Sequence, residues 1–287
     1  MGEREKREIK DLIDWRPFAG LWGMKPKDLV ETSAGEELMD DAFSMLDLIL
    51  FDEEKRSQHS SSMFAKPHQG EIVEIKAAIS INPARKTGKD VTITHGDAST
   101  TFNFLRQPMQ KTSGYNMCLS DFLHPKDWLG CFAVWVNGID KKADELARSG
   151  DDYRSIMMQA LGDRLAEATA EFMHREIRQK YWGYGDANLS IDEIIEEKFQ
   201  GIRPAPGYPA CPDHTQKIKI LNWLNVPSNE VTLTEGLAMM PKSAICGWYF
   251  ANPESKYFGI GRLPKEYLDD LENRNELFKK YRHHLDR

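Results

Sequence analysis

The sequence predicts an α+β fold built on one dominant sheet, and two observations carry this prediction. Short runs rich in β-branched residues, with alternating apolar and polar positions, occur at 71–81, 90–96 and 100–105. A largely apolar run follows at 131–138 and predicts a central strand. Between 151 and 182, apolar residues recur at helical spacing, which predicts one long helix.

We expect the long helix to begin at Asp151 or Asp152, either of which can cap it, and to end near Trp182 before Gly183. At 1.5 Å per residue, about 30 residues span roughly 45 Å, which suits a helix lying across a whole sheet. The predicted buried stripe consists of Ile156, Met157, Ala160, Leu161, Leu165, Ala168, Phe172 and Ile177.

The remaining elements follow from periodicity, capping residues and turn residues. They are a helix over 33–51, a polar loop over 52–62, a helix over 188–199 with Ser190 as its N-cap, a proline-rich loop over 201–214, a helix over 217–226, strand pairs around turns over 231–261, and a charged amphipathic helix over 263–286.

Composition narrows the class of protein. The 287 residues are 40% hydrophobic and 29% charged, as in globular proteins, and no stretch approaches the roughly 18 apolar residues of a membrane span. The charged N-terminus has no apolar signal core, so we expect a cytoplasmic protein. A net charge of -7 argues against a broad nucleic-acid-binding surface. The four cysteines form no C-x-x-C pair, which predicts buried thiols and no metal site.

The loop 201–214 is the first candidate binding element. Its prolines exclude helix and regular strand and reduce the entropy lost when it orders around a ligand. Arg203 offers a forked, permanently charged donor suited to a carboxylate. The alternative is a rigid structural turn, with Arg203 in a surface ion pair.

Three further segments have both a functional and a plain structural interpretation. Arg164, Glu167 and Glu171 share one helix face, which either borders a cleft or is a solvated charged stripe. The aromatic residues of 247–261 either stack against a flat ring or pack the sheet, and the segment 12–18 is equally a surface turn. No Ser-His-Asp set, G-x-G-x-x-G loop or Walker loop is present in the sequence.

Together these segments resemble one family, the activation domain of cobalamin-dependent methionine synthase. The resemblance covers roughly residues 10–270, so we expect 1–287 to form a single domain of this kind. It is carried by GIRPAPGYPACPDHT (201–215), the helix segment 151–184, LTEGLAM (233–239) and GWYFANPESKYF (247–258), and more loosely by LIDWRPF (12–18) and 104–125.

The resemblance implies a C-shaped α+β unit, with a twisted antiparallel sheet and a shallow surface groove that binds S-adenosylmethionine. The ligand residues that it implies are Asp14, Glu167, Arg203, Ala205, Gly207, Tyr208 and Tyr257. It implies no catalytic residue and no metal ligand in this chain. Asp163 and Glu197 match positions near the corrinoid-facing side.

The implied activity is reactivation in methionine biosynthesis: reductive methylation of cob(II)alamin on a corrinoid methyltransferase partner, with an electron from a flavodoxin-like donor. The sequence has no D-x-H-x-x-G cobalamin loop, so cobalamin is expected only through the partner, and the chain is not a complete enzyme alone. The alternatives are an S-adenosylmethionine sensor without reactivation activity, or a methyltransferase with another acceptor. The match weakens over 52–103 and after 261, and the chain is either an excised domain or a separately encoded subunit.

Overall fold

The computed structural model describes residues 2–55, 73–108, 115–185 and 189–282. The chain divides into two compact units. Unit 1 comprises Met1–Lys76, Val134–Phe172 and Pro241–Ala244, and unit 2 comprises Ala77–Ala133, Met173–Met240 and Ile245–Arg287. No helix among the described residues is long and apolar enough to cross a membrane.

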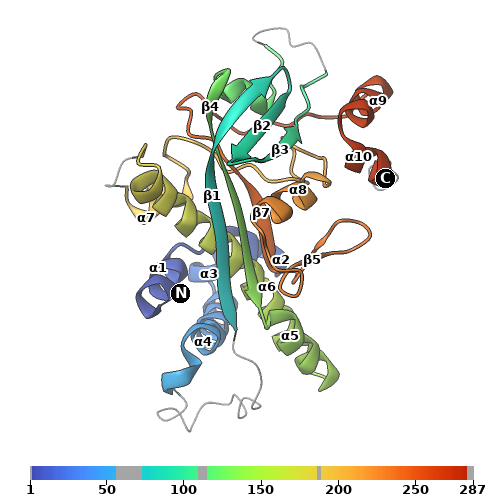
Figure 1. Cartoon of the computed structure of the whole chain (residues 1–287). Helices are drawn as coiled ribbons and strands as arrows, with labels where there is room; N and C mark the ends of the chain where they lie inside the picture. The colour runs from blue at the N-terminus through green and yellow to red at the C-terminus, as the bar shows by residue number, and fades with distance from the viewer. Residues whose placement is uncertain (1, 56–72, 109–114, 186–188, 283–287) are drawn as a thin grey trace. The chain divides into compact units, whose positions relative to one another are not determined.

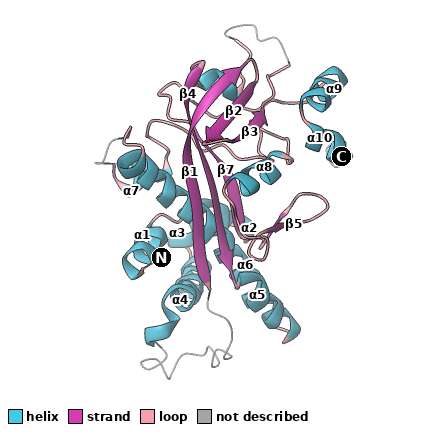
Figure 2. Ribbon diagram, in the orientation of Figure 1, coloured by secondary structure: helices cyan, strands magenta, loops and turns pink. Residues whose placement is uncertain are grey.

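The main sheet has five antiparallel strands in the order β3-β2-β1-β4-β7. Its strands are β1 (Glu74–Thr87), β2 (Asp90–His95), β3 (Ala98–Asn103), β4 (Lys126–Asn137) and β7 (Ala244–Tyr249), drawn as magenta arrows in Figure 2. A separate pair joins β5 (Thr232–Leu233) to β6 (Met239–Met240). The predicted α+β class is confirmed.

Each predicted strand is present, but one detail differs from the prediction. Eight successive β4 residues, 129–136, are buried, as expected for a strand covered on both faces. The middle strand of the five is nevertheless β1. Strand β2 pairs with the C-terminal end of β1, and β3 pairs with the other edge of β2. The part of the first predicted strand at 71–72 lies outside the described residues.

Unit 1 contains the N-terminal helices. They are α1 (Glu3–Asp11), α2 (Arg16–Leu21), α3 (Asp28–Glu31) and α4 (Ser33–Lys55), and α5 (Ile139–Arg148) comes later in the chain. Ile9, Phe18 and Leu46 are buried completely or almost so. The short helices α1–α3 and α5 were not predicted, since few apolar residues recur in each. The prediction of a loop at 52–55 was wrong, because α4 continues there past a kink at Phe51; 56–62 lie outside the described residues.

The long helix is confirmed as α6 (Asp152–Glu176), which continues into a π-helical turn at Ile177–Tyr181. Asp151 caps its first turn by accepting a hydrogen bond from the Arg154 N–H at 3.1 Å. The predicted stripe is buried except for Ile156, which is 47% exposed and was assigned to the core wrongly.

Unit 2 contains the helices α7 (Ile191–Ile195), α8 (Gln216–Trp223), α9 (Lys265–Arg274) and α10 (Glu276–Tyr281), and a short 3-10 turn at Leu119–Phe122. Ser190 caps α7 as predicted. The C-terminal helices lie beside the β2–β3 hairpin (Figure 1), and Arg274 of α9 pairs with Asp90 of β2.

The single C-terminal helix predicted over 263–286 is instead two helices that meet at Asn275, while 283–286 lie outside the described residues. Asn275 adopts an extended backbone, and its side chain donates hydrogen bonds to Asp213 and Thr215. A long-range polar contact therefore interrupts a segment whose local pattern favours one helix.

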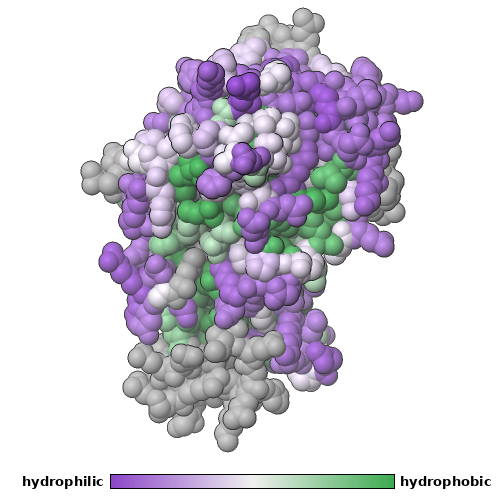
Figure 3. All heavy atoms as spheres, in the orientation of Figure 1, coloured by the Kyte–Doolittle hydropathy of each residue, from purple (hydrophilic) through white to green (hydrophobic). Residues whose placement is uncertain are grey.

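All four cysteines are buried and free, as predicted. Burial raises the pKa of Cys246 to about 12, so this thiol stays protonated and unreactive at neutral pH. Hydrophilic residues cover most of the face seen in Figure 3, and apolar residues show between them.

The buried Asp213 carboxylate ties the proline loop to α8 and α10. It accepts hydrogen bonds from Thr215, Gln216 and Asn275. We expect Asp213→Ala to lower the free energy of unfolding in urea by at least about 3 kcal/mol, because several buried donors lose a charged acceptor. Asp269→Ala removes a partly exposed ion pair with Arg282, which keeps Glu272 as a partner, and should cost at most about 1 kcal/mol. Equal costs for the two variants would contradict this assignment.

Candidate functional site

The proline loop 201–214 is held to strand β7 by backbone hydrogen bonds. Ile202 and Phe250 exchange two bonds of 3.0 Å, and the Trp248 N–H donates to the Pro204 carbonyl at 3.0 Å. The loop takes part in two isolated β-bridges, Ile202 with Phe250 and Tyr208 with Cys211. Elsewhere it forms neither helix nor strand. The prediction from its prolines is therefore confirmed.

Two glycines permit this close approach. A Cβ at Gly247 would lie 2.3 Å from the Pro204 carbonyl oxygen and 2.8 Å from the Phe132 ring. Gly201 has a φ of +92°, and its Cβ would lie 2.6 Å from the Phe250 carbonyl oxygen. Larger residues at either position would force the loop away from the strand.

The tip of the loop is a compact turn that uses its own backbone groups. The Gly207 N–H donates to the Cys211 carbonyl at 2.7 Å, and the Tyr208 N–H donates to the Ala205 carbonyl at 3.3 Å. Gly207 has a φ of +93°, which favours glycine. Ala205 is buried, whereas Gly207, Tyr208 and Pro209 are exposed, so the tip presents these last three residues to solvent.

The structure brings Tyr257 to the start of this loop. The Arg203 backbone N–H donates to the Tyr257 hydroxyl at 3.1 Å. Tyr257 is 44% exposed and Arg203 is half-buried. Of the predicted ligand residues, five therefore lie in unit 2, on this loop or in contact with it: Arg203, Ala205, Gly207, Tyr208 and Tyr257.

A buried histidine lies behind the loop and was not identified from the sequence. His174 stacks on Tyr249 with ring centroids 5.2 Å apart, and its Nε2 lies 3.3 Å from the Tyr184 hydroxyl. Burial, together with the positive charges of Arg178 and Arg203, lowers the pKa of His174 well below its ordinary value. A neutral imidazole therefore contacts Tyr184, whose hydroxyl lies beside Gly201 at the start of the loop.

The other two predicted ligand residues, Asp14 and Glu167, lie in unit 1. Arg16 donates to Asp14 from its backbone N–H and twice from its guanidinium. Burial raises the pKa of Asp14, but the hydrogen bonds and charge of Arg16 and the charge of Arg164 outweigh it, and the net shift is downward. Asp14 is therefore a carboxylate at neutral pH.

Glu167 is half-buried on α6, as is Arg164. Glu171, on the same face, is only 5% exposed, so the interpretation of this face as a solvated stripe was wrong for that residue. The roles of Asp14 and Glu167 as ligand residues stay predictions.

The chain matches a family model described as vitamin B12 dependent methionine synthase, activation domain, over residues 6–276. It belongs to this family. Among solved structures it is similar to the MetH reactivation domain bound to AdoHcy, with 35% identity and a TM-score of 0.81. The match covers 96% of this chain and 86% of that one.

In this activation domain, Asp163 of α6 lies beside the start of β7. The Ser243 hydroxyl donates to it at 3.2 Å. Burial, with the nearby carboxylates of Asp140 and Glu167, raises the pKa of Asp163 against the opposing effects of Ser243 and Arg164. Glu197, the other residue matched to the corrinoid-facing side, has a φ of +55°. Their contact with a corrinoid partner stays a prediction.

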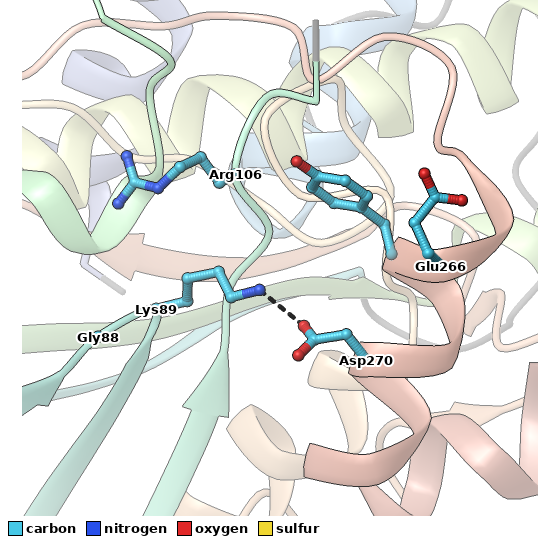
Figure 4. A pocket seen from close by; sticks show the side chains of 6 residues that line it. Gly88, Lys89, Arg106, Glu266 and Asp270 are labelled. Atoms are coloured by element: carbon cyan, nitrogen blue, oxygen red, sulfur yellow. Dashed lines mark hydrogen bonds and ion pairs between the residues drawn. The ribbon is translucent and has the colours of Figure 1, made fainter.

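A separate cavity of about 470 Å³ in unit 2 of this domain is lined by Gly88, Lys89, Arg106, Glu266, Tyr267 and Asp270. Figure 4 shows Lys89 pointing toward Asp270, which it pairs with at 2.6 Å. Arg106 makes a bidentate pair with Asp121. Because both cations already pair with carboxylates, neither is left to attract an anionic ligand to this cavity.

We expect Gly247→Ala to lower the free energy of unfolding by about 2 kcal/mol or more, because the new methyl group would overlap Pro204 and Phe132. Urea denaturation measures this loss. The matched control is Gly236→Ala, where the nearest atom would lie 4.0 Å away and the change should stay within about 0.5 kcal/mol. A Gly247→Ala protein as stable as the control would show that the loop moves from β7 without cost.

Proposed function

We propose that this chain binds S-adenosylmethionine and supports reductive methylation of cob(II)alamin on a corrinoid methyltransferase partner, as part of methionine biosynthesis. Membership of the activation-domain family supports the proposal. So does the similarity to a reactivation domain bound to AdoHcy. AdoHcy is what remains of S-adenosylmethionine after the methyl group leaves, so a site for one suits the other.

The observation that carries the proposal is the geometry at the start of the proline loop. The bond from the Arg203 backbone to Tyr257 fixes the backbone from which the Arg203 guanidinium extends. A guanidinium can form two parallel hydrogen bonds with the carboxylate of the ligand. The Tyr257 ring, partly exposed beside it, is available to the flat adenine.

The tip of the loop limits what backbone contacts a ligand can make. The Gly207 N–H and the Ala205 carbonyl are already bonded within the loop. We therefore assign the Gly207 carbonyl, an acceptor, to the hydroxyl or amino groups of the ligand. Tyr208, which is exposed, extends the surface offered to the ligand beside Gly207. Ala205 can contact the ligand only through the small part of it that is not buried.

Asp14 and Glu167 supply the negative charge that the ligand requires. S-Adenosylmethionine carries an ammonium and a sulfonium, and opposite charges are expected near each. The lowered pKa of Asp14 keeps it ionised over the neutral range. We assign the two carboxylates jointly to these two positive groups.

In the proposed reaction, the role of this protein is to position the methyl donor. Cobalt on the partner gains one electron from a flavodoxin-like donor and then accepts the methyl group, while the electrons of the broken sulfur–carbon bond neutralise the sulfonium. No proton moves in this transfer, so general acid–base residues are not required. Asp163 belongs to the surface that we assign to the partner. A cytoplasmic location stays the expectation from the sequence.

We expect Arg203→Ala to weaken S-adenosylmethionine binding about ten- to a hundredfold in calorimetric titration, the cost of one charge-assisted pair at a partly exposed site. Arg203→Lys should rescue poorly, because an ammonium lacks the fork. The melting temperature without ligand should stay near that of the wild type. Arg262→Ala, at an exposed arginine, is the matched control and should bind normally.

If Arg203→Ala binds as tightly as the wild type, the carboxylate is held elsewhere. If it unfolds, the interpretation of the loop as a purely structural turn is correct.

The activity itself is tested with the partner. Mixed with a partner loaded with cob(II)alamin, S-adenosylmethionine and a reductant, the chain should produce the absorbance of methylcobalamin, and Arg203→Ala should slow its appearance. Alone, the purified chain should carry no stoichiometric corrinoid. Tight S-adenosylmethionine binding without methylcobalamin formation would favour the sensor function instead.

A further inference from the structure

His214 packs directly against the exposed tip of the proline loop. A Cβ at Gly207 would lie 2.5 Å from His214 Cε1 and 3.1 Å from both ring nitrogens. The ring edge therefore occupies the space beside the Gly207 backbone that a side chain would fill. Gly207 is one of the residues that we assign to the ligand, so His214 supports a ligand-binding position from behind.

A lysine sets which ring nitrogen of this imidazole carries the proton. Lys217 Nζ lies 3.0 Å from His214 Nδ1 and also donates to the Leu237 carbonyl at 2.9 Å. An ammonium has no acceptor, so His214 Nδ1 must accept, and the ring proton lies on Nε2. We call this hydrogen bond from Lys217 to His214 the lock. It holds only while the imidazole is neutral.

We propose that His214 is a positioning residue for the ligand loop: as a neutral imidazole locked by Lys217 it holds Gly207 in place, and its protonation releases the tip. The proposal rests on the proposed function, because it requires Gly207 to contact the ligand. A protonated ring would place a second N–H and a second positive charge against the Lys217 ammonium. The ring must then rotate, and the contact with Gly207 is lost.

Two charged groups lie beside His214 and act on it in opposite directions. They are Lys217 of α8 and Asp213, which precedes His214 in the loop. Burial is the main cause that lowers the pKa of His214, and the charge of Lys217 adds to it, while Asp213 opposes both. Since the folded protein holds the neutral form, the lock is intact at neutral pH. It weakens as the pH falls below the ordinary range of histidine.

The test compares S-adenosylhomocysteine binding by calorimetry at pH 7.5 and pH 5.5. For the wild type we expect affinity to fall roughly three- to tenfold at the lower pH, the size of one lost polar contact. In His214→Asn, the side-chain oxygen can still accept from Lys217 and cannot titrate. This variant should bind with similar affinity at both values. His124→Asn, at an exposed histidine of the same unit, should keep the wild-type pH dependence.

A second measurement does not depend on any variant. Nitrogen-15 chemical shifts of the His214 ring at pH 7.5 should show a protonated Nε2 and an unprotonated Nδ1. A protonated Nδ1 would overturn the lock. Wild-type binding that is unchanged at a pH where these shifts show the His214 ring protonated, or a pH dependence that His214→Asn retains, would overturn the proposal while leaving the proposed function intact. Absence of wild-type binding at pH 7.5 would overturn both.

Discussion

The contact between the proline loop and strand β7 is the constraint on which the candidate site depends. The chain passes so close to the strand that its carbonyl at Pro204 occupies the space where Gly247 would carry a side chain. Three backbone hydrogen bonds, two exchanged between Ile202 and Phe250 and one donated by Trp248 to the Pro204 carbonyl, then fix the direction in which the loop leaves the sheet. Arg203 lies between these two attachment points, so its backbone has little freedom.

Local periodicity predicted the elements whose own sequence pattern is long and regular. It failed where a residue distant in the sequence changes the local structure. The helix α6 and the buried strand β4 have long, regular patterns, and both were predicted from them. The break at Asn275 was not, because its cause is a hydrogen bond to Asp213, far away in the sequence. Ile156 has an apolar side chain at a helical position and is nevertheless exposed, since the pattern cannot show where a neighbouring element ends.

The part of the candidate site that lies in the proline loop was predictable, because its residues belong to one motif. Arg203, Gly207 and Tyr208 lie within one short stretch of the loop, and the resemblance alone linked them to Tyr257, which the structure brings to Arg203. The histidines that support the loop gave no such signal. His174 looks like any polar residue near a helix end, and the packing of His214 on Gly207 follows from the turn at 205–211, which no periodicity reveals.

Both histidines beside the loop are kept neutral, and for the same physical reason. Each is at least partly buried and faces a cation: Arg178 and Arg203 act on His174, and Lys217 acts on His214. An enzyme that moves protons would place a carboxylate beside such a ring to hold it near the operating pH. At His174 burial and the neighbouring cations do the opposite, and at His214 burial and Lys217 outweigh the opposing charge of Asp213, so both imidazoles serve as uncharged supports. That arrangement suits the proposed transfer, in which a methyl group and an electron move and the protein must only hold a carboxylate in a fixed direction.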